Sequence, residues 1–253
     1  MSSSTHKPAS FSFSYSLGGT PPAAAAVPTP GPNLHNAPTQ IDAGDRMVDV
    51  LMSMRSPRIV LFGNLLSAEE CQALIETAQP RMQRSKTFSN VAGGYSSAVS
   101  PARTSDGTKF KREETPLVAR IEARIARLVQ WPQAHAEGLQ VMYYRPGAEY
   151  KPHYDYFDPA LPGTSTLTRN GGQRVASLVM YLQHSATGGG TTFPDVQLEV
   201  APRQGSAVFF SYERPHPSTR PPARCTLHAG APVISGDKWI ATKWFREREY
   251  SAT

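Results

Sequence analysis

The spacing of hydrophobic residues changes at Gly138, and this change limits the folds open to the chain. Before it, residues 117–129 place apolar side chains at helical intervals. After it, short apolar runs alternate with breaks rich in glycine and proline, at residues 139–144, 175–182, 206–210 and 239–245. Such runs are typical of strands. We therefore predict a mainly β fold with flanking helices, in which the helices come first and the strands after.

Two helices are expected ahead of the strands. Ser67, followed by Glu69 and Glu70, is a helix start signal and predicts a helix over residues 68–78 that Pro80 ends. The second helix follows Pro116 and ends before residues 131–132. Several short strands after flanking helices fit a double-stranded β-helix, or jelly roll, whose two sheets leave a mouth for a ligand.

The first part of the chain differs in composition from the rest. Residues 1–40 contain one charged residue, Lys7, and half of them are Pro, Ser or Ala. Such a segment cannot bury enough apolar surface to offset chain entropy. We expect residues 1–45 to be a disordered tail and 46–253 to form a single domain. No run approaches the roughly 18 apolar residues of a membrane span, and a secretory signal is not evident, so we expect a cytoplasmic protein without membrane partners.

The net charge of the chain indicates which kinds of partner it could bind. The chain has 26 Lys and Arg against 20 Asp and Glu, a net charge of +6, and the basic residues gather between positions 81 and 127. This favours an acidic partner but is also explained by solubility, and no nucleic-acid recognition motif accompanies it.

Residues 103–111 lack hydrophobic periodicity, which predicts a mobile loop over a substrate. The two cysteines, Cys71 and Cys225, are expected to be buried thiols.

A histidine and a carboxylate stand two residues apart at His153 and Asp155. In extended chain these side chains project from one face, so both can reach one metal ion. The tripeptide alone also fits a surface histidine beside a solvated aspartate. A second histidine would complete a three-ligand face that leaves three positions of an octahedral ion open. We prefer His228 for this role; His216, in a proline-rich segment, is the alternative.

Lys238 follows His228 by ten residues. It shares strand parity with Ile240, Thr242 and Trp244, so a strand here would place its cation on a face with apolar and aromatic neighbours. An inward lysine is costly unless an anion meets it. This position therefore suggests a bound carboxylate.

Several ordered blocks resemble the iron(II) and 2-oxoglutarate dependent dioxygenases, and within them the prolyl 4-hydroxylase type. The resemblance covers about residues 58–249. It rests on the blocks at residues 140–144, 150–157, 171–174, 189–194, 227–230 and 236–239, with a substrate-side loop at 103–105.

The resemblance assigns roles residue by residue. His153, Asp155 and His228 would bind iron, and Lys238 would pair with the distal carboxylate of 2-oxoglutarate. These four would be the catalytic set. Two further groups would serve the cofactor and the substrate: Tyr144 and Thr191 would hydrogen-bond 2-oxoglutarate, and Arg103, Tyr150, Arg174 and Trp244 would face the substrate.

The implied reaction is hydroxylation of a prolyl residue in a peptide or protein. It would use Fe(II), 2-oxoglutarate and O2, release succinate and CO2, and take ascorbate as reductant. One alternative is the same chemistry on another residue or a free amino acid. Another is a jelly roll that binds metal or peptide without turnover. Nucleic-acid demethylation is a third, favoured only by the net charge.

Overall fold

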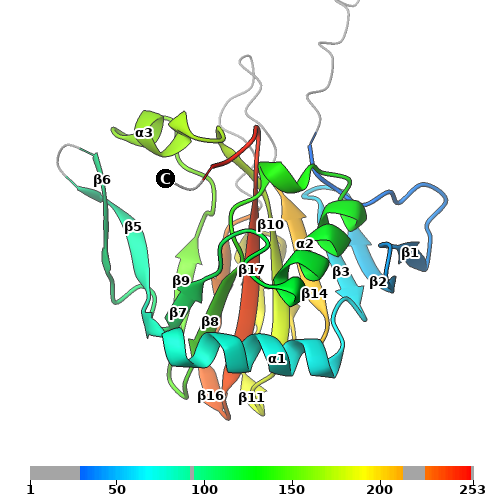
Figure 1. Cartoon of the computed structure of the whole chain (residues 1–253). Helices are drawn as coiled ribbons and strands as arrows, with labels where there is room; N and C mark the ends of the chain where they lie inside the picture. Colours follow the sequence, from blue (N-terminus) through cyan, green and yellow to red (C-terminus); the bar gives the residue numbers. More distant parts are fainter. Residues whose placement is uncertain (1–28, 92–93, 213–225, 252–253) are drawn as a thin grey trace, which may run out of the picture.

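A computed structural model describes residues 29–91, 94–212 and 226–251. Helices α1 (Ala68–Ala78) and α2 (Pro116–Leu128) lie against one face of a nine-stranded sheet, as Figure 1 shows. A four-stranded sheet lies on the other side of the large sheet. Within these ranges no helix is long and apolar enough to cross a membrane.

The large sheet has the strand order β1-β2-β3-β14-β10-β17-β8-β7-β4. Its strands, in chain order, are β1 (Gln40–Asp42), β2 (Met47–Met54), β3 (Ile59–Gly63), β4 (Gln83–Arg84), β7 (Asp106–Lys109), β8 (Gln140–Tyr144), β10 (Arg174–Gln183), β14 (Ala207–Ser211) and β17 (Lys238–Arg246). The small sheet has the order β13-β12-β15-β9, with β9 (Tyr150–His153), β12 (Thr191–Phe193), β13 (Leu198–Val200) and β15 (His228–Gly230).

Two strand pairs and four short helices complete the described fold. The remaining elements are the hairpin β5 (Lys86–Val91) with β6 (Gly94–Val99), the pair β11 (Thr187–Gly188) with β16 (Val233–Ser235), the helix α3 (Thr164–Arg169), and the 3₁₀ turns η1 (Gln79–Arg81), η2 (Gln133–His135) and η3 (Pro194–Val196).

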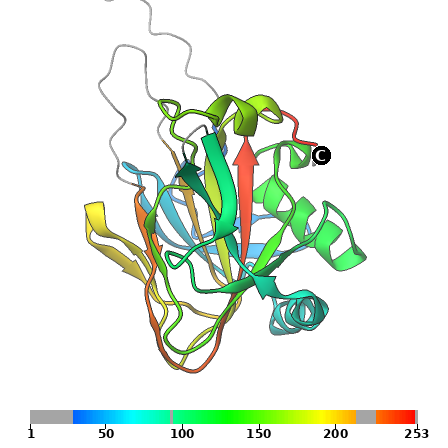
Figure 2. The same cartoon turned by 90° about the vertical axis from the view of Figure 1, so that its left-hand side faces the viewer.

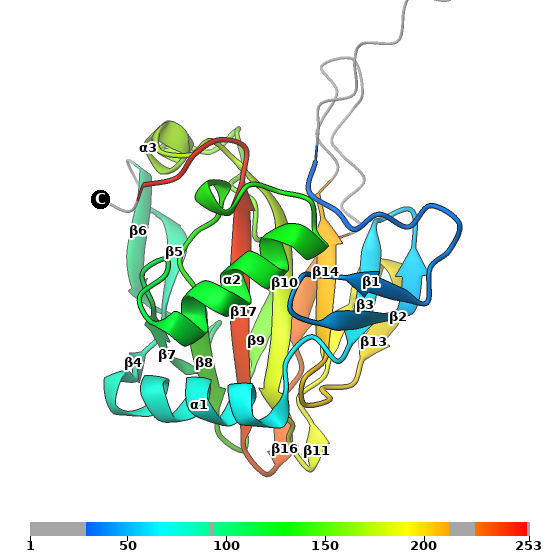
Figure 3. The same ribbon diagram turned by 45° about the vertical axis from the view of Figure 1, so that its right-hand side comes forward.

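Helix α1 begins and ends where the sequence predicts. The Ser67 hydroxyl accepts from the Glu70 backbone N–H, and the Glu70 side chain accepts from Ser67 N–H, which together form a capping box. Glu70 also pairs with Arg124 of α2, with Oε1 2.7 Å from Nη2. The apolar faces of both helices pack on the large sheet (Figure 3). These contacts hold the outer face of the sheet fixed.

The opposite face of the large sheet supplies the inside of the jelly roll. Side chains alternate along β17, so Trp239 and Ala241 join the helix-side core while Ile240 belongs to the second core between the sheets. Figure 2, turned by 90°, shows the helices on one side of the large sheet and β15, in orange, on the other. The predicted double-stranded β-helix with flanking helices is confirmed, and the four predicted strands are each placed within one residue of their observed ends.

Two predictions about the first part of the chain are wrong. Strands β1, β2 and β3 precede the first helix, so the order of helices before strands does not hold. The folded part also begins ahead of residue 46: Ala43 is buried, and the Gly31 N–H donates to the carbonyl of Val129 at 2.7 Å. The Gly31 hydrogen bond joins the segment to the residue that follows α2, and a backbone bond of this kind leaves no sign in the composition. Residues 1–28 of the predicted tail lie outside the described part of the chain.

The predicted loop over residues 103–111 is also corrected. Residues 106–109 form β7, which pairs with β8 and with β4 in the large sheet. Backbone hydrogen bonds to β8 support this strand, so it needs no apolar periodicity of its own. Cys71 is buried as predicted, and burial raises the pKa of its thiol to about 11. The predictions for Cys225 and His216 fall on residues outside the described ranges.

Candidate metal centre and substrate groove

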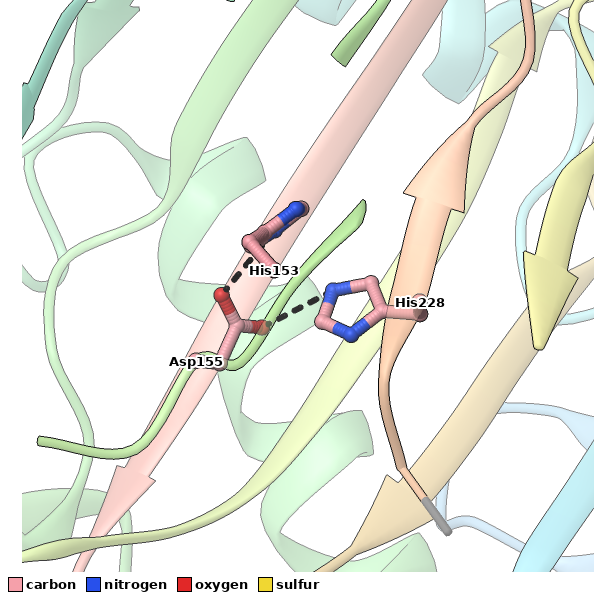
Figure 4. Close-up of side chains that lie close together, drawn as sticks. All are labelled: His153, Asp155 and His228. Atoms are coloured by element: carbon pink, nitrogen blue, oxygen red, sulfur yellow. Dashed lines mark ion pairs between the residues drawn. The ribbon is translucent and has the colours of Figure 1, made fainter. Parts of the chain in front are cut away.

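The structure brings the three predicted metal ligands together. His153 ends β9, Asp155 follows two residues later, and His228 begins β15, which pairs with β9 so that the two histidines are register partners. His153 Nε2 lies 3.6 Å from Asp155 Oδ1, and His228 Nε2 lies 3.5 Å from Asp155 Oδ2. Figure 4 shows the carboxylate between the two imidazoles. One ligand atom from each residue lies within 4.8 Å of the others, so one ion can meet all three.

Backbone carbonyls fix the orientation of both imidazoles. His153 Nδ1 lies 2.8 Å from the carbonyl oxygen of Lys151, and His228 Nδ1 lies 3.0 Å from that of Thr226. A carbonyl only accepts, so each Nδ1 carries the proton and donates it. The Nε2 lone pairs are thereby left for a metal, which is the arrangement common to histidine ligands.

The charges at the cluster suit a divalent cation. Burial favours the neutral acid of Asp155, but the attraction of His228, His153 and Arg174 outweighs it and holds the pKa of this carboxyl well below its usual range. Burial and the neighbouring His153 lower the pKa of His228 to about 4, against the attraction of Asp155. At neutral pH the carboxylate is therefore charged and this imidazole is uncharged, as metal ligation requires. Two imidazoles and one carboxylate are the ligand set of the non-haem iron(II) oxygenases.

A residue that the sequence analysis missed supports the carboxylate. The Ser177 hydroxyl, on β10, donates to Asp155 Oδ2 at 2.6 Å and also contacts the Tyr212 hydroxyl. Ser177 is fully buried and lies on the same face of β10 as Val179 and Tyr181. A small polar residue on an otherwise apolar strand face was the available signal, although the pattern does not reveal its partner.

We expect Ser177→Ala to weaken metal binding by about tenfold, because outer hydrogen bonds to a ligand typically contribute 10- to 100-fold to metal affinity. An anaerobic Fe(II) titration measures the effect. Ser206→Ala is the matched control, since its buried hydroxyl donates to the Arg203 carbonyl instead of to a ligand. Equal Fe(II) affinity in both variants would show that Ser177 does not orient Asp155.

A small inner pocket leads away from the cluster between the two sheets. Among the residues that line it are Lys238, Tyr144 and Thr191. Lys238 and Tyr144 are register partners on β17 and β8, and Lys238 Nζ lies 5.2 Å from the centroid of the Tyr144 ring. The Thr191 hydroxyl accepts a hydrogen bond from Tyr181, a residue that the sequence analysis did not select, at 2.7 Å.

Lys238 is a buried cation that no carboxylate of the described residues neutralises. Its relative exposure is 1%, and it forms no ion pair with any residue in the described ranges. Burial lowers the pKa of its ammonium to about 8. A buried ammonium without a carboxylate partner costs folding energy, and a bound ligand that supplies the negative charge would offset this cost.

An outer groove of about 930 Å³ opens on the other side of the cluster. The groove and the inner pocket share Arg103, Tyr150, Asp155 and Trp244, so the two cavities meet at the metal cluster. An ion held there would have the inner pocket on one side and the groove on the other. This is the layout that a cosubstrate and a larger substrate need to meet at one metal.

All four predicted substrate-side residues line the groove: Arg103, Tyr150, Arg174 and Trp244. Burial raises the pKa of the Tyr150 hydroxyl to about 12, and the Tyr150 ring stacks on that of His153 with centroids 3.6 Å apart. Trp244 lies under the Arg174 guanidinium, whose carbon is 4.0 Å from the indole centroid. Each aromatic ring is thus held in place by a neighbour at the cluster.

Glu137 is a second residue that the sequence analysis missed. Its buried carboxylate pairs with Arg174 Nε at 2.7 Å and with Arg246 Nε at 2.8 Å. Arg174 Nη1 in turn donates to the Asp155 carbonyl at 3.2 Å. Glu137 therefore offsets part of the charge of these two arginines and fixes Arg174 behind the metal cluster.

Comparisons with known proteins agree with this site. The 2OG-Fe(II) oxygenase superfamily profile matches residues 139–246, which include all three ligands and Lys238. "Probable prolyl 4-hydroxylase 3" of Arabidopsis thaliana is 38% identical over 82% of this chain and 75% of its own. "Prolyl 4-hydroxylase 5" of the same plant is also 38% identical, over 82% of this chain and 74% of its own.

A solved structure extends the likeness to three dimensions. The viral collagen prolyl hydroxylase vCPH from Paramecium Bursaria Chlorella virus-1, in its 2OG complex, superposes with a TM-score of 0.55 and 29% identity, over 74% of this chain and 95% of that one. The sequence similarity, the shared fold and the three converging ligands agree with one another. The chain belongs to the 2OG-Fe(II) oxygenase superfamily, as an enzyme of the prolyl 4-hydroxylase type that uses Fe(II) and 2-oxoglutarate.

Proposed function

We propose that this enzyme hydroxylates prolyl residues in a peptide or protein substrate. The observation that carries the proposal is the meeting of two cavities at one ligand cluster. One cavity holds a buried lysine, and the other is an open groove with aromatic rings beside the cluster. The prolyl 4-hydroxylase relatives support a peptide as the occupant of the groove.

The residues of the inner pocket match the cosubstrate. His153, Asp155 and His228 would hold Fe(II), and Lys238 would pair with the distal carboxylate of 2-oxoglutarate. Tyr144 lines the same pocket. When bound, iron and 2-oxoglutarate supply the oxidising chemistry that inserts one atom of O2 into a C–H bond and releases succinate and CO2.

The residues of the groove bind and orient the substrate. Tyr150 and Trp244 offer flat aromatic surfaces on which a proline ring packs, and both lie where the groove meets the metal cluster. Packing there would remove water from around the target carbon. The Arg174 guanidinium, which pairs with Glu137, lies over the Trp244 ring and holds that ring in place. Ascorbate is proposed as the reductant that keeps the iron ferrous.

Mass spectrometry of products tests this function and separates it from the alternatives. Purified enzyme with Fe(II), 2-oxoglutarate and ascorbate is offered a proline-containing peptide, the same peptide with alanine at each proline, and free proline. The proposal requires the gain of one oxygen atom on proline of the first peptide, with matching succinate release. Modification of another residue or of free proline alone would favour the first alternative, and binding without succinate release would favour a non-catalytic module.

The affinity for 2-oxoglutarate is expected to fall as pH rises above about 8. An anion binds the protonated form of Lys238, whose pKa is about 8 in the unliganded protein, and binding raises that pKa. The protonation of Lys238 therefore leaves the affinity for 2-oxoglutarate unchanged below pH 8. Above pH 8 the affinity falls by up to about tenfold per pH unit. Titrations between about pH 7 and pH 9.5, with Mn(II) in place of Fe(II), measure the dependence. If Lys238→Met showed the same fall of affinity with pH, the pH dependence would belong to another group.

A further inference from the structure

We propose that the groove selects prolines flanked by acidic residues, glutamate or aspartate, and that Arg84, Lys86 and Lys109 determine this preference. The inference rests on the proposed function and names its substrate class. The three cations stand on β4, β5 and β7, and all three line the groove and are exposed in it. None was selected as a site residue from the sequence.

The three cations form no ion pair with a carboxylate in the described part of the chain. Arg84 donates to the Ser105 carbonyl, and Lys86 and Lys109 form no ion pair with a described carboxylate. Two other basic residues of the groove differ in this respect, since Arg81 pairs with Glu114 at 2.6 Å and Arg174 with Glu137 at 2.7 Å.

Two carboxylates line the groove, Asp155 and Asp158, against six basic residues: Arg81, Arg84, Lys86, Arg103, Lys109 and Arg174. Asp155 faces the two histidines as a metal ligand, and Asp158 accepts from the Ala160 N–H at 2.9 Å. The groove therefore presents an excess of positive charge to whatever occupies it. Charge of one sign on a groove wall attracts ligands of the opposite sign and raises their rate of association.

The position of Lys109 places this charge next to the reacting proline. Its Nζ lies 5.8 Å from the centroid of the Trp244 ring, which is at the junction with the metal cluster. Lys109 is also the register partner of Gln140 on β8. A peptide with its proline at Trp244 would bring a residue only one or two positions away beside this ammonium, because successive residues in extended chain are about 3.3 Å apart.

The floor of the groove favours a peptide over another polyanion. Gln140 and Trp244 line the groove, and their buried atoms Gln140 Oε1 and Trp244 Nε1 have no hydrogen-bond partner among the residues described. One is an acceptor and the other a donor, which are the two groups that a peptide backbone complements. Nucleic acid would bring phosphates for the cations, but phosphate oxygens only accept hydrogen bonds and cannot donate to Gln140.

Two peptides that differ only in charge test the inference. Each has one proline, flanked on both sides by glutamate in one peptide and by glutamine in the other. We expect kcat/KM to be at least about tenfold higher for the glutamate peptide at low ionic strength, and the ratio to fall as salt screens the charges. Fluorescence anisotropy of the labelled peptides, measured anaerobically, gives the binding preference separately from turnover.

Variants assign the preference to the named residues. The double variant Arg84→Gln/Lys109→Gln is expected to bring the glutamate-to-glutamine ratio close to one, and Lys86→Gln to reduce it. Lys111→Gln is the matched control, because Lys111 is exposed, close in sequence and not part of the groove lining. It should retain the wild-type ratio. Circular dichroism and the bound Fe(II) content verify that each variant is folded.

The outcomes separate this inference from the proposed function. Equal hydroxylation and equal binding of both peptides would overturn the acidic preference and leave prolyl hydroxylation in place. Preferential binding of the glutamate peptide without hydroxylation would support the preference and reject the reaction. Tighter binding of a single-stranded oligouridylate than of the glutamate peptide would overturn the inference in favour of a nucleic-acid site, as would an unchanged ratio in the double variant.

Discussion

Replacing His153 with alanine is expected to reduce turnover by at least about 1,000-fold, or roughly 4 kcal/mol of activation free energy. His153 supplies one of the three ligand atoms that lie within 4.8 Å of one another, and without it this cluster keeps two of its three ligands. The fold should survive, since the His153 side chain is partly exposed and its contacts are with the Lys151 carbonyl, Tyr150, Asp155 and His228. Succinate release measures turnover, and metal analysis measures bound iron.

His184→Ala is the control for this substitution. His184 is exposed and lies outside the metal cluster. It should keep wild-type iron content and turnover. Near-normal turnover in His153→Ala would contradict the assignment of the ligands, whereas loss of activity together with loss of the folded state in thermal denaturation would mean that the residue is structural.

Replacing Lys238 with methionine is expected to raise the KM for 2-oxoglutarate by about 100-fold. Truncating one partner of a buried charge pair typically costs 2–5 kcal/mol of binding free energy. The same substitution should stabilise the unliganded protein. Burial lowers the pKa of this lysine to about 8, so below that pH the folded state holds its proton less tightly than the unfolded state and loses stability. Removing the group should recover up to about 3 kcal/mol.

The two effects of Lys238→Met have opposite signs, which makes the test specific. Steady-state kinetics gives the KM, and urea denaturation without ligands gives the free energy of unfolding. Lys111→Met, at an exposed position, should change neither by more than about 0.5 kcal/mol. An unchanged 2-oxoglutarate requirement in Lys238→Met would reject its role as the anion partner.

The parts of the site that the sequence predicted are those with a strong local pattern. The four main strands were predicted to within one residue because their apolar runs end at glycine or proline breaks. Strand parity placed Lys238 on the inner face of β17, which the structure confirms through its position in the inner pocket. For the third ligand, the residues around each histidine favoured His228 over His216, and the resemblance then assigned His153, Asp155 and His228 as one set.

Features that depend on distant partners were not predictable. Residues 29–45 and strand β7 are held by backbone hydrogen bonds to other segments, and such bonds leave no side-chain pattern. Ser177 and Glu137 act through side chains 22 and 37 residues away in the chain, Asp155 and Arg174 respectively. The charge of the groove likewise appeared in the sequence as a diffuse basic segment, and only the fold shows which of its cations form no ion pair with a described carboxylate.

The central claim is that one cluster of two imidazoles and a carboxylate joins a cosubstrate pocket to a peptide groove. The most direct test is an anaerobic titration of the purified protein with Fe(II) and then 2-oxoglutarate, followed by admission of O2 in the presence of the glutamate-flanked proline peptide. The account predicts a visible charge-transfer band that needs both additions, and then one oxygen atom gained on proline for each succinate released. A protein that binds neither, or that consumes 2-oxoglutarate without any gain of oxygen on a peptide, would contradict it.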